Sequence, residues 1–328
     1  MARTLRSRKK TSNLRSKIIL IALLFVLIAV VLFSYFVYSS KPSYKSRAET
    51  VDSPSEVVGG YTARYDDWSF LVELVDKRQI DVSNPKSVIT KRTDALICGG
   101  SLISNEWVIT ARHCITFTDI DKENLVVAYY KKNFSEPSIA EVSDIIIYQE
   151  NGNEPTEDLA LIRLKNAVDA PTISLTDTFP YPLDFTGYKV IIEQTDVAIA
   201  GWGRIDQRKK ELPAEPKEAV LVTISPLFND NIFIQDPAYR SGACSGDSGG
   251  PLVAYQKGRR VLVGVAYGAV NACGEFTQYV NLTKHKFLSW IAMPRPDIKT
   301  GITVLQGNLM GNPLPKPPMA KDRWYQKK

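Results

Sequence analysis

One serine in this 328-residue chain lies in a setting that suits nucleophilic chemistry. Ser248 occupies the loop Gly246-Asp247-Ser248-Gly249-Gly250-Pro251. Glycines on both sides let the backbone turn tightly, free the amide of Gly246, and leave room for a substrate carbonyl to approach the serine oxygen. A Gly-Asp-Ser-Gly string taken alone is also typical of a simple turn, so a catalytic interpretation requires partner residues elsewhere in the chain.

The partner that a reactive serine needs most is a base, because a serine hydroxyl is a weak nucleophile at neutral pH. The chain contains two histidines: His113 follows an apolar strand pattern at Trp107 and Val108, whereas His285 lies in a predicted terminal helix. The base needs a buried acceptor that fixes its tautomer, and Asp158 stands at the head of an apolar strand. These residues are the candidate base and the candidate orienting acid.

The elements that must position these residues are predicted to be short strands. Residues 57–293 contain β-branched and aromatic runs that are broken by Gly, Pro and Asn. The runs cover 70–74, 125–130, 145–148, 159–164, 190–192, 219–224, 252–255 and 261–267. Only residues 283–293 have an amphipathic helical pattern. The segment therefore predicts an all-β barrel or sandwich that is closed by one helix.

The charge of the chain is unevenly distributed. Residues 1–56 carry ten Lys/Arg against three acids, and residues 294–328 carry seven against two. These ends hold +7 and +5 of a total of +6, which leaves −6 for residues 57–293. An acidic folded segment disfavours nucleic acid as a partner. The proline-rich basic end, 294–328, is predicted to be a solvated tail.

All four cysteines lie in the acidic segment: Cys98, Cys114, Cys244 and Cys273. Four cysteines can pair in three ways, and the sequence contains no Cys-X-X-Cys pair. With only two histidines in the chain, a Cys/His zinc site is poorly supplied, so we expect disulfides and no metal or other cofactor. Disulfides indicate an oxidising compartment.

The N-terminus has the pattern of a membrane anchor. Residues 1–17 are basic with no acid, and 18–38 form an apolar run of 21 residues. A helix of that length spans about 31 Å, which matches a bilayer core. The basic flank predicts a cytoplasmic N-terminus and an exported domain after a polar stalk at 39–56. A cleaved signal peptide is the alternative, which would make the protein secreted, although Val37-Tyr38-Ser39-Ser40 is a poor cleavage site.

Residues 57–293 resemble the chymotrypsin-like (trypsin-like) serine proteases. The order His113, Asp158, Ser248 and the spacings of 45 and 90 residues agree with that family. Further family-like strings occur in family order: Val57-Val58-Gly59-Gly60, Cys98-Gly99-Gly100-Ser101-Leu102, Gly201-Trp202-Gly203 and the serine loop.

The resemblance implies two six-stranded antiparallel β-barrels with a C-terminal helix. His113 and Asp158 would come from the first barrel and Ser248 from the second, with the active site in the cleft between them. The amides of Gly246 and Ser248 would form the oxyanion hole.

The resemblance also implies two disulfides and an activation switch. Cys98 would pair with Cys114, and Cys244 with Cys273. In the family, a freed N-terminus folds inward and pairs with the acid before the catalytic serine, here Val57 with Asp247. The chain is therefore expected to be a zymogen cut at Glu56-Val57, although Glu56 replaces the family's usual basic residue and leaves the activating protease open.

The substrate pocket departs from the trypsin pattern. Gly242 stands where trypsin-type members carry an aspartate, six residues before the serine. Glu275 aligns near the opposite wall and is a candidate acid for a basic substrate side chain. The alternative is an apolar pocket lined by Ala243 and Gly268. The polar stretch 76–95 is an insertion-like loop near the cleft, a candidate for restricting substrates or binding a partner.

These observations predict a membrane-tethered serine endopeptidase that acts outside the cytoplasm through an acyl-enzyme. Its partners would be a polypeptide substrate and the membrane, through residues 18–38. The activating cut would be made by another protease or by the protein itself. The main alternative is a catalytically weak or inactive homologue that uses the cleft for binding. An envelope scaffold that displays the proline-rich tail is a third hypothesis, but it leaves the serine, histidine and aspartate unexplained.

Overall fold

The computed structural model describes residues 60–118, 120–150, 157–177, 196–224, 231–236, 241–256, 259–270, 273–293 and 302–305. The predicted basic segment 1–17, membrane segment 18–38 and stalk 39–56 lie outside these residues, and so does Val57. Within the described ranges, no helix is long and apolar enough to cross a membrane.

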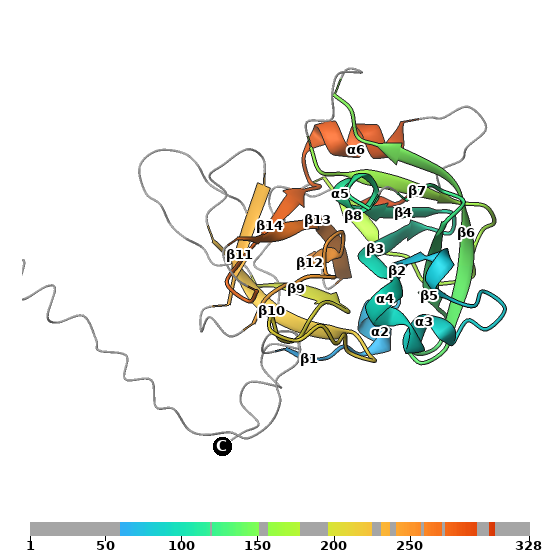
Figure 1. Ribbon diagram of the computed structural model, residues 1–328. Coiled ribbons are helices and arrows are strands. Elements are labelled where there is room, and N and C mark those ends of the chain that lie inside the picture. The colour runs from blue at the N-terminus through green and yellow to red at the C-terminus, as the bar shows by residue number, and fades with distance from the viewer. Residues whose placement is uncertain are drawn as a thin grey trace, which may run out of the picture. The chain divides into compact units, whose positions relative to one another are not determined.

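Six antiparallel strands close into the first barrel in the order β2-β3-β4-β7-β6-β5 (Figure 1). Their bounds are β2 Leu71–Asp76, β3 Leu96–Ser104, β4 Trp107–Thr110, β5 Leu125–Tyr130, β6 Pro137–Ile147 and β7 Ala160–Leu164. Leu71, Leu102 and Ile109 point into the core and are fully buried. Each such side chain contributes about 1.5–3 kcal/mol of hydrophobic stabilisation, which fixes the strand register.

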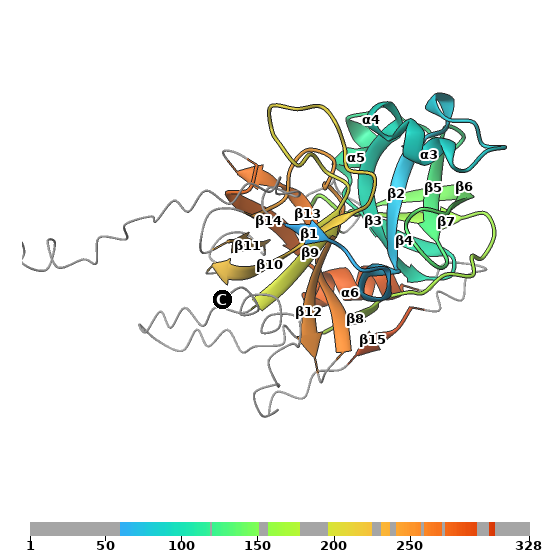
Figure 2. The same ribbon diagram turned by 90° about the horizontal axis from the view of Figure 1, so that it is seen from below.

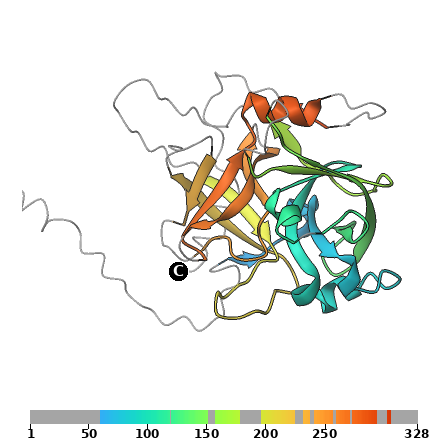
Figure 3. The same ribbon diagram turned by 45° about the horizontal axis from the view of Figure 1, so that its top comes forward.

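A second ring of six antiparallel strands follows, in the order β12-β9-β10-β11-β14-β13 and closed by the pairing of β12 with β13. Their bounds are β9 Asp196–Gly201, β10 Lys217–Ile224, β11 Asn231–Gln235, β12 Pro251–Gln256, β13 Arg259–Val270 and β14 Phe276–Asn281. The two barrels lie side by side (Figures 1 and 3). The expected pair of six-stranded antiparallel barrels is confirmed.

Three short strands extend the second sheet. β1 Tyr61–Thr62 pairs with β10. β8 Ser174–Thr176 runs parallel to β13, and β15 Val304–Leu305 runs parallel to β8 (Figure 2). The prediction of a solvated tail over 294–328 is therefore wrong for Val304 and Leu305. Together with Ile302, they form the β-branched and aliphatic run of the tail, and Ile302 and Val304 pack against the main core.

The predicted C-terminal helix is present as α6 His285–Ala292. Its buried face contacts the first barrel, since the Tyr148 ring lies 5.1 Å from Phe287 and 5.2 Å from Trp290, measured between ring centroids. Helices of a single turn were not predicted: α2 Tyr65–Trp68, η1 Lys77–Gln79, α3 Ser87–Thr90, α4 Arg92–Ala95 and α5 His113–Thr116. Such helices are too short for a 3.6-residue pattern to appear in the sequence.

Candidate active site

His113 and Asp158 are brought together by the pairing of β4 with β7. The register places Thr110 opposite Ala160, so His113 begins α5 just beyond one strand while Asp158 precedes the other. His113 Nδ1 lies 2.6 Å from Asp158 Oδ2, and the His113 backbone N–H donates to Oδ1 at 2.7 Å. The carboxylate is 1% exposed. It therefore holds the ring and its backbone together, which favours the tautomer with the proton on Nδ1 and a free acceptor at Nε2.

The serine loop docks onto the first barrel through its backbone. The Gly99 N–H of β3 donates to the Ser248 carbonyl at 2.8 Å. Gly249 has φ +75°, and a side chain there would approach both Thr110 Oγ1 and the Gly99 carbonyl to within 3 Å. Only glycine fits this contact. Since Thr110 ends the strand that leads to His113, the docking brings Ser248 to the edge that carries His113.

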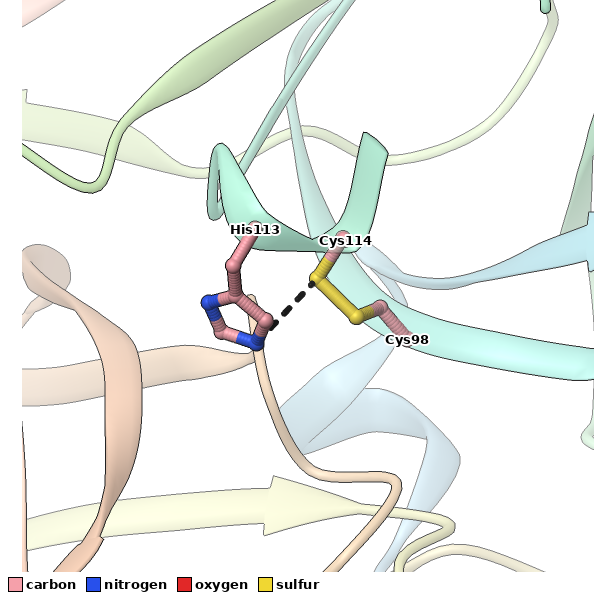
Figure 4. Close-up of side chains that lie close together, drawn as sticks. All are labelled: Cys98, His113 and Cys114. Carbon is pink, nitrogen blue, oxygen red and sulfur yellow. Dashed lines mark hydrogen bonds between the residues drawn. A yellow bond between two sulfur atoms is a disulfide. The ribbon is translucent and has the colours of Figure 1, made fainter. Parts of the chain in front are cut away.

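The Ser248 hydroxyl is not bonded to His113 in this structure. Among the described residues, no hydrogen bond involves Ser248 Oγ. The atom near His113 Nε2 is Cys114 Sγ, 3.9 Å away and part of the Cys98–Cys114 disulfide (Figure 4). A disulfide sulfur has no proton to donate, so Nε2 keeps its lone pair. Because both sulfurs are bonded to each other, the cluster of Cys98, His113 and Cys114 is not a metal site.

The amides of the serine loop fall into two groups. Those of Asp247, Gly249 and Gly250 donate to backbone carbonyls at 2.9–3.0 Å. Those of Gly246 and Ser248 donate to no described residue. Gly246 adopts φ +103°, a backbone conformation that favours glycine. The loop thus presents the two amides that the resemblance assigns to an oxyanion hole, without an internal acceptor for either.

Asp247 is buried beneath this loop. Its carboxylate accepts from the backbone N–H groups of Gly203 at 2.8 Å and Cys244 at 2.9 Å. A side chain at Gly201 or Gly203 would come within 3 Å of the carboxylate, which explains the Gly-Trp-Gly sequence. Asp247 forms no ion pair with a described residue, and burial raises its pKa to about 6.

A cavity of about 10 Å³ adjoins the Asp247 carboxylate. It is lined by Ile199, Ala200, Gly201, Asp247, Gly250, Pro251 and Tyr279. Its size matches about one water molecule. The sequence-predicted partner of this carboxylate, Val57, lies outside the described residues.

A larger cavity of about 270 Å³ opens beside Ser248. It is lined by Gln207, Ala243, Cys244, Ser245, Ser248, Ala266, Gly268, Ala269, Cys273 and Thr277. The Cys244–Cys273 disulfide forms part of its wall. Cys98 is bonded to Cys114 as well, and both cysteine pairings that the resemblance implied are therefore confirmed. Ala243 and Gly268, which the sequence named for the apolar alternative, are among the lining residues, and the described lining carries no charged side chain.

Two predicted pocket residues do not line the cavity. Gly242 is buried against the backbone of Gly274, whose Cα would lie 2.8 Å from a Cβ at position 242. Glu275 is half-buried and is also absent from the lining. Thr277 was not predicted as a pocket residue; it is 1% exposed and lies two residues before the buried Tyr279 on β14. Residues two apart on a strand lie on the same face, so the pattern of β14 could have assigned Thr277 to the face that carries Tyr279.

Two closed barrels with a histidine–aspartate pair on one and a docked serine loop on the other define a trypsin-like serine protease domain. The family model described as Trypsin matches residues 57–291, and the chain belongs to this family. Clotting factor C of Tachypleus tridentatus is 32% identical over 228 residues, which is 60% of this chain and 22% of that protein. Limulus clotting factor C of Carcinoscorpius rotundicauda matches with the same figures. The chain thus spans about a fifth of the length of these relatives.

Proposed function

We propose that the protein is a serine endopeptidase that hydrolyses peptide bonds through an acyl-enzyme on Ser248. The observation that carries this proposal is the Asp158–His113 pair at the edge where the serine loop docks, together with two loop amides that have no described acceptor. A binding surface alone would not require this combination.

In the first half of the reaction, Ser248 Oγ attacks the substrate carbonyl carbon while His113 Nε2 takes the hydroxyl proton. The amides of Gly246 and Ser248 donate to the carbonyl oxygen as it becomes negative. Asp158 stays ionised and stabilises the imidazolium. His113 then passes its proton to the leaving amine nitrogen, the C–N bond breaks, and an ester on Ser248 remains.

Water completes the cycle by the reverse sequence. His113 takes a proton from the water, the hydroxide attacks the ester carbonyl, and the proton returns to Ser248 Oγ as the C–O bond breaks. The products are a carboxylate and a free serine. Hydrogen bonds between catalytic groups often form only when the substrate is bound, so the missing Ser248–His113 bond is compatible with this sequence.

The chain is proposed to be made as a zymogen that is cut at Glu56-Val57. Support comes from Asp247, which is buried, faces no described cation and has a pKa raised by burial to about 6. A freed Val57 ammonium would supply the missing charge and hold the carboxylate ionised. The activator acts in trans or is the protein itself. N-terminal sequencing of active material should begin at Val57, and full activity with the bond intact would rule this out.

The proposed location is a single-pass membrane protein that is anchored by residues 18–38, with its catalytic domain on the periplasmic, extracellular or lumenal side. If the N-terminal segment is cleaved, the protein is secreted. The apolar run with its basic flank supports the anchor, and the two disulfides support an oxidising compartment.

The substrate residue before the cleaved bond is proposed to be uncharged. The described wall of the 270 Å³ cavity is neutral, and Glu275 does not line it. Of the two alternatives from the sequence, this favours the pocket lined by Ala243 and Gly268 over one in which Glu275 binds a basic side chain, although Ser245 and Thr277 make its wall less apolar than expected. Cleavage of a peptide library should therefore exclude Lys and Arg at that position, and a strong enrichment of either residue would refute the assignment.

The second candidate function is a binding homologue, which the missing Ser248–His113 hydrogen bond favours. A serine-directed phosphonate distinguishes the two. The endopeptidase proposal requires covalent labelling of the cut protein and none in Ser248→Ala. Labelling that persists unchanged in Ser248→Ala, or no labelling of the cut protein, would support the binding function.

A further inference from the structure

Arg92 is a buried cation whose five N–H groups all have acceptors. It lies on α4 within the 76–95 segment and is 3% exposed. Nε and one terminal nitrogen donate to the two carboxylate oxygens of Glu73, at 2.6 and 3.1 Å. The other terminal nitrogen donates to the carbonyls of Pro213 at 3.0 Å and Ala214 at 2.7 Å. The remaining N–H donates to Tyr130 Oη at 3.3 Å.

These partners belong to both halves of the molecule. Glu73 lies on β2 and Tyr130 ends β5, so both are in the first barrel, and the Tyr130 hydroxyl also donates to Glu73. Pro213 and Ala214 precede β10 of the second barrel. The guanidinium carbon lies 5.4 Å from the ring centroid of Trp202, which follows β9. Arg92 therefore joins the 76–95 segment to the second barrel across the boundary between them.

The segment of the second barrel that Arg92 holds, residues 203–216, also contacts the serine loop. At its start, the Gly203 N–H donates to Asp247. The Arg204 N–H then donates to the Ser245 carbonyl at 2.8 Å, and Gln207 lines the large cavity. The beginning of this segment thus supports the serine loop and the pocket, while its end is fixed by Arg92.

From these contacts we infer that Arg92 is a positioning residue. It holds residues 203–216 in the conformation that keeps Gly203 on Asp247 and Gln207 at the pocket. A planar guanidinium meets this geometry because it points N–H groups at a carboxylate and at two backbone carbonyls simultaneously. The 76–95 segment is then a part of the machinery and not merely a tolerated surface loop.

The inference rests on the proposed peptidase function for its kinetic consequences only. The conformation of residues 203–216 is measurable without any activity. Two measurements test the inference. The first is amide hydrogen exchange of residues 203–216. The second is steady-state kinetics of the cut full-length protein, with kcat calculated per phosphonate-titrated site and KM measured for the same peptide.

The variants are Arg92→Met combined with Glu73→Gln, which leaves no buried charge unpaired, and Arg92→Lys, which keeps the charge but loses the fork. Lys165→Met is the matched control, because Lys165 forms an exposed ion pair with Glu141 in the first barrel. In both Arg92 variants, exchange in 203–216 should accelerate at least about tenfold more than in β4 and β7. KM for a peptide that fills the pocket should rise at least about tenfold in the double variant, less in Arg92→Lys, and not in Lys165→Met.

If Arg92 had a merely structural role, the Arg92 variants would have a lower melting temperature and exchange would accelerate equally in all strands. Their KM, and their kcat per titrated site, would stay at the parent values. That result overturns the inference. If the double variant does not fold, Arg92→Lys decides by the same two criteria. Failure of the parent protein to react with phosphonate would count against the peptidase proposal alone, and the local exchange of 203–216 would still test Arg92.

Discussion

The buried carboxylate of Asp247 predicts how the stability of the uncut chain depends on pH. Burial raises its pKa from 3.8 to about 6. The folded state therefore binds a proton that the unfolded state has released between these two values. Stability falls as pH rises through this window, and the loss is complete above pH 6. The difference between these two pKa values corresponds to about 3 kcal/mol.

The assay is urea unfolding of full-length Ser248→Ala, which cannot cut itself, between pH 4 and pH 8. Other groups titrate in the same range, so Asp247→Asn serves as the reference that lacks this one titration. The free energy of unfolding of the parent, minus that of Asp247→Asn, should fall by about 2 kcal/mol across this range, because the carboxylate of the unfolded chain is already mostly ionised at pH 4. After cleavage at Glu56-Val57, the fall should disappear, because the Val57 ammonium keeps the carboxylate ionised. A difference that stays constant with pH in the uncut chain would refute the reasoning.

Three further predictions concern the site. Asp158→Asn should lower kcat by about 10⁴-fold in steady-state assays with little change in KM, because the His113 ring loses the acceptor that fixes its tautomer; an unchanged kcat would contradict this. Gly242→Asp should lower the melting temperature without creating cleavage after Lys or Arg in a peptide library, because its Cβ meets the Gly274 backbone. Replacing both Cys98 and Cys114 by Ser opens a loop with a sequence separation of 16 and should cost about 3 kcal/mol in denaturant unfolding, whereas a cost below about 1 kcal/mol would argue against the bridge.

The candidate catalytic residues could be selected from the sequence because their signals are local. Ser248 lies in a glycine-rich string, and His113 and Asp158 adjoin apolar strands whose pairing brings them together. The barrels followed from resemblance, since β-branched runs alone allowed either a barrel or a sandwich. The resemblance assigned the amides of Gly246 and Ser248 to an oxyanion hole, and the structure adds that neither amide has an acceptor among the described residues.

What the sequence could not predict depends on long-range contacts. Glu73 lies 19 residues before Arg92, and Ala214 lies 122 residues after it, so no local pattern indicated the buried network. The interpretation of 76–95 as a polar loop missed it for that reason. The pocket stayed open between two alternatives because Glu275 precedes β14, so the two-residue period of that strand does not fix where its side chain points. Thr277 lines the cavity, whereas Glu275 does not.

The most direct test of the central claim is a pre-steady-state burst with a fluorogenic ester whose acyl group carries an uncharged side chain. Full-length protein that has been cut at Glu56-Val57 should release about one fluorophore per chain in the burst, followed by slower turnover. Ser248→Ala, cut in the same way, should show no burst. A cut parent protein without a burst, or an equal burst from Ser248→Ala, would contradict the assignment of Ser248 as the nucleophile.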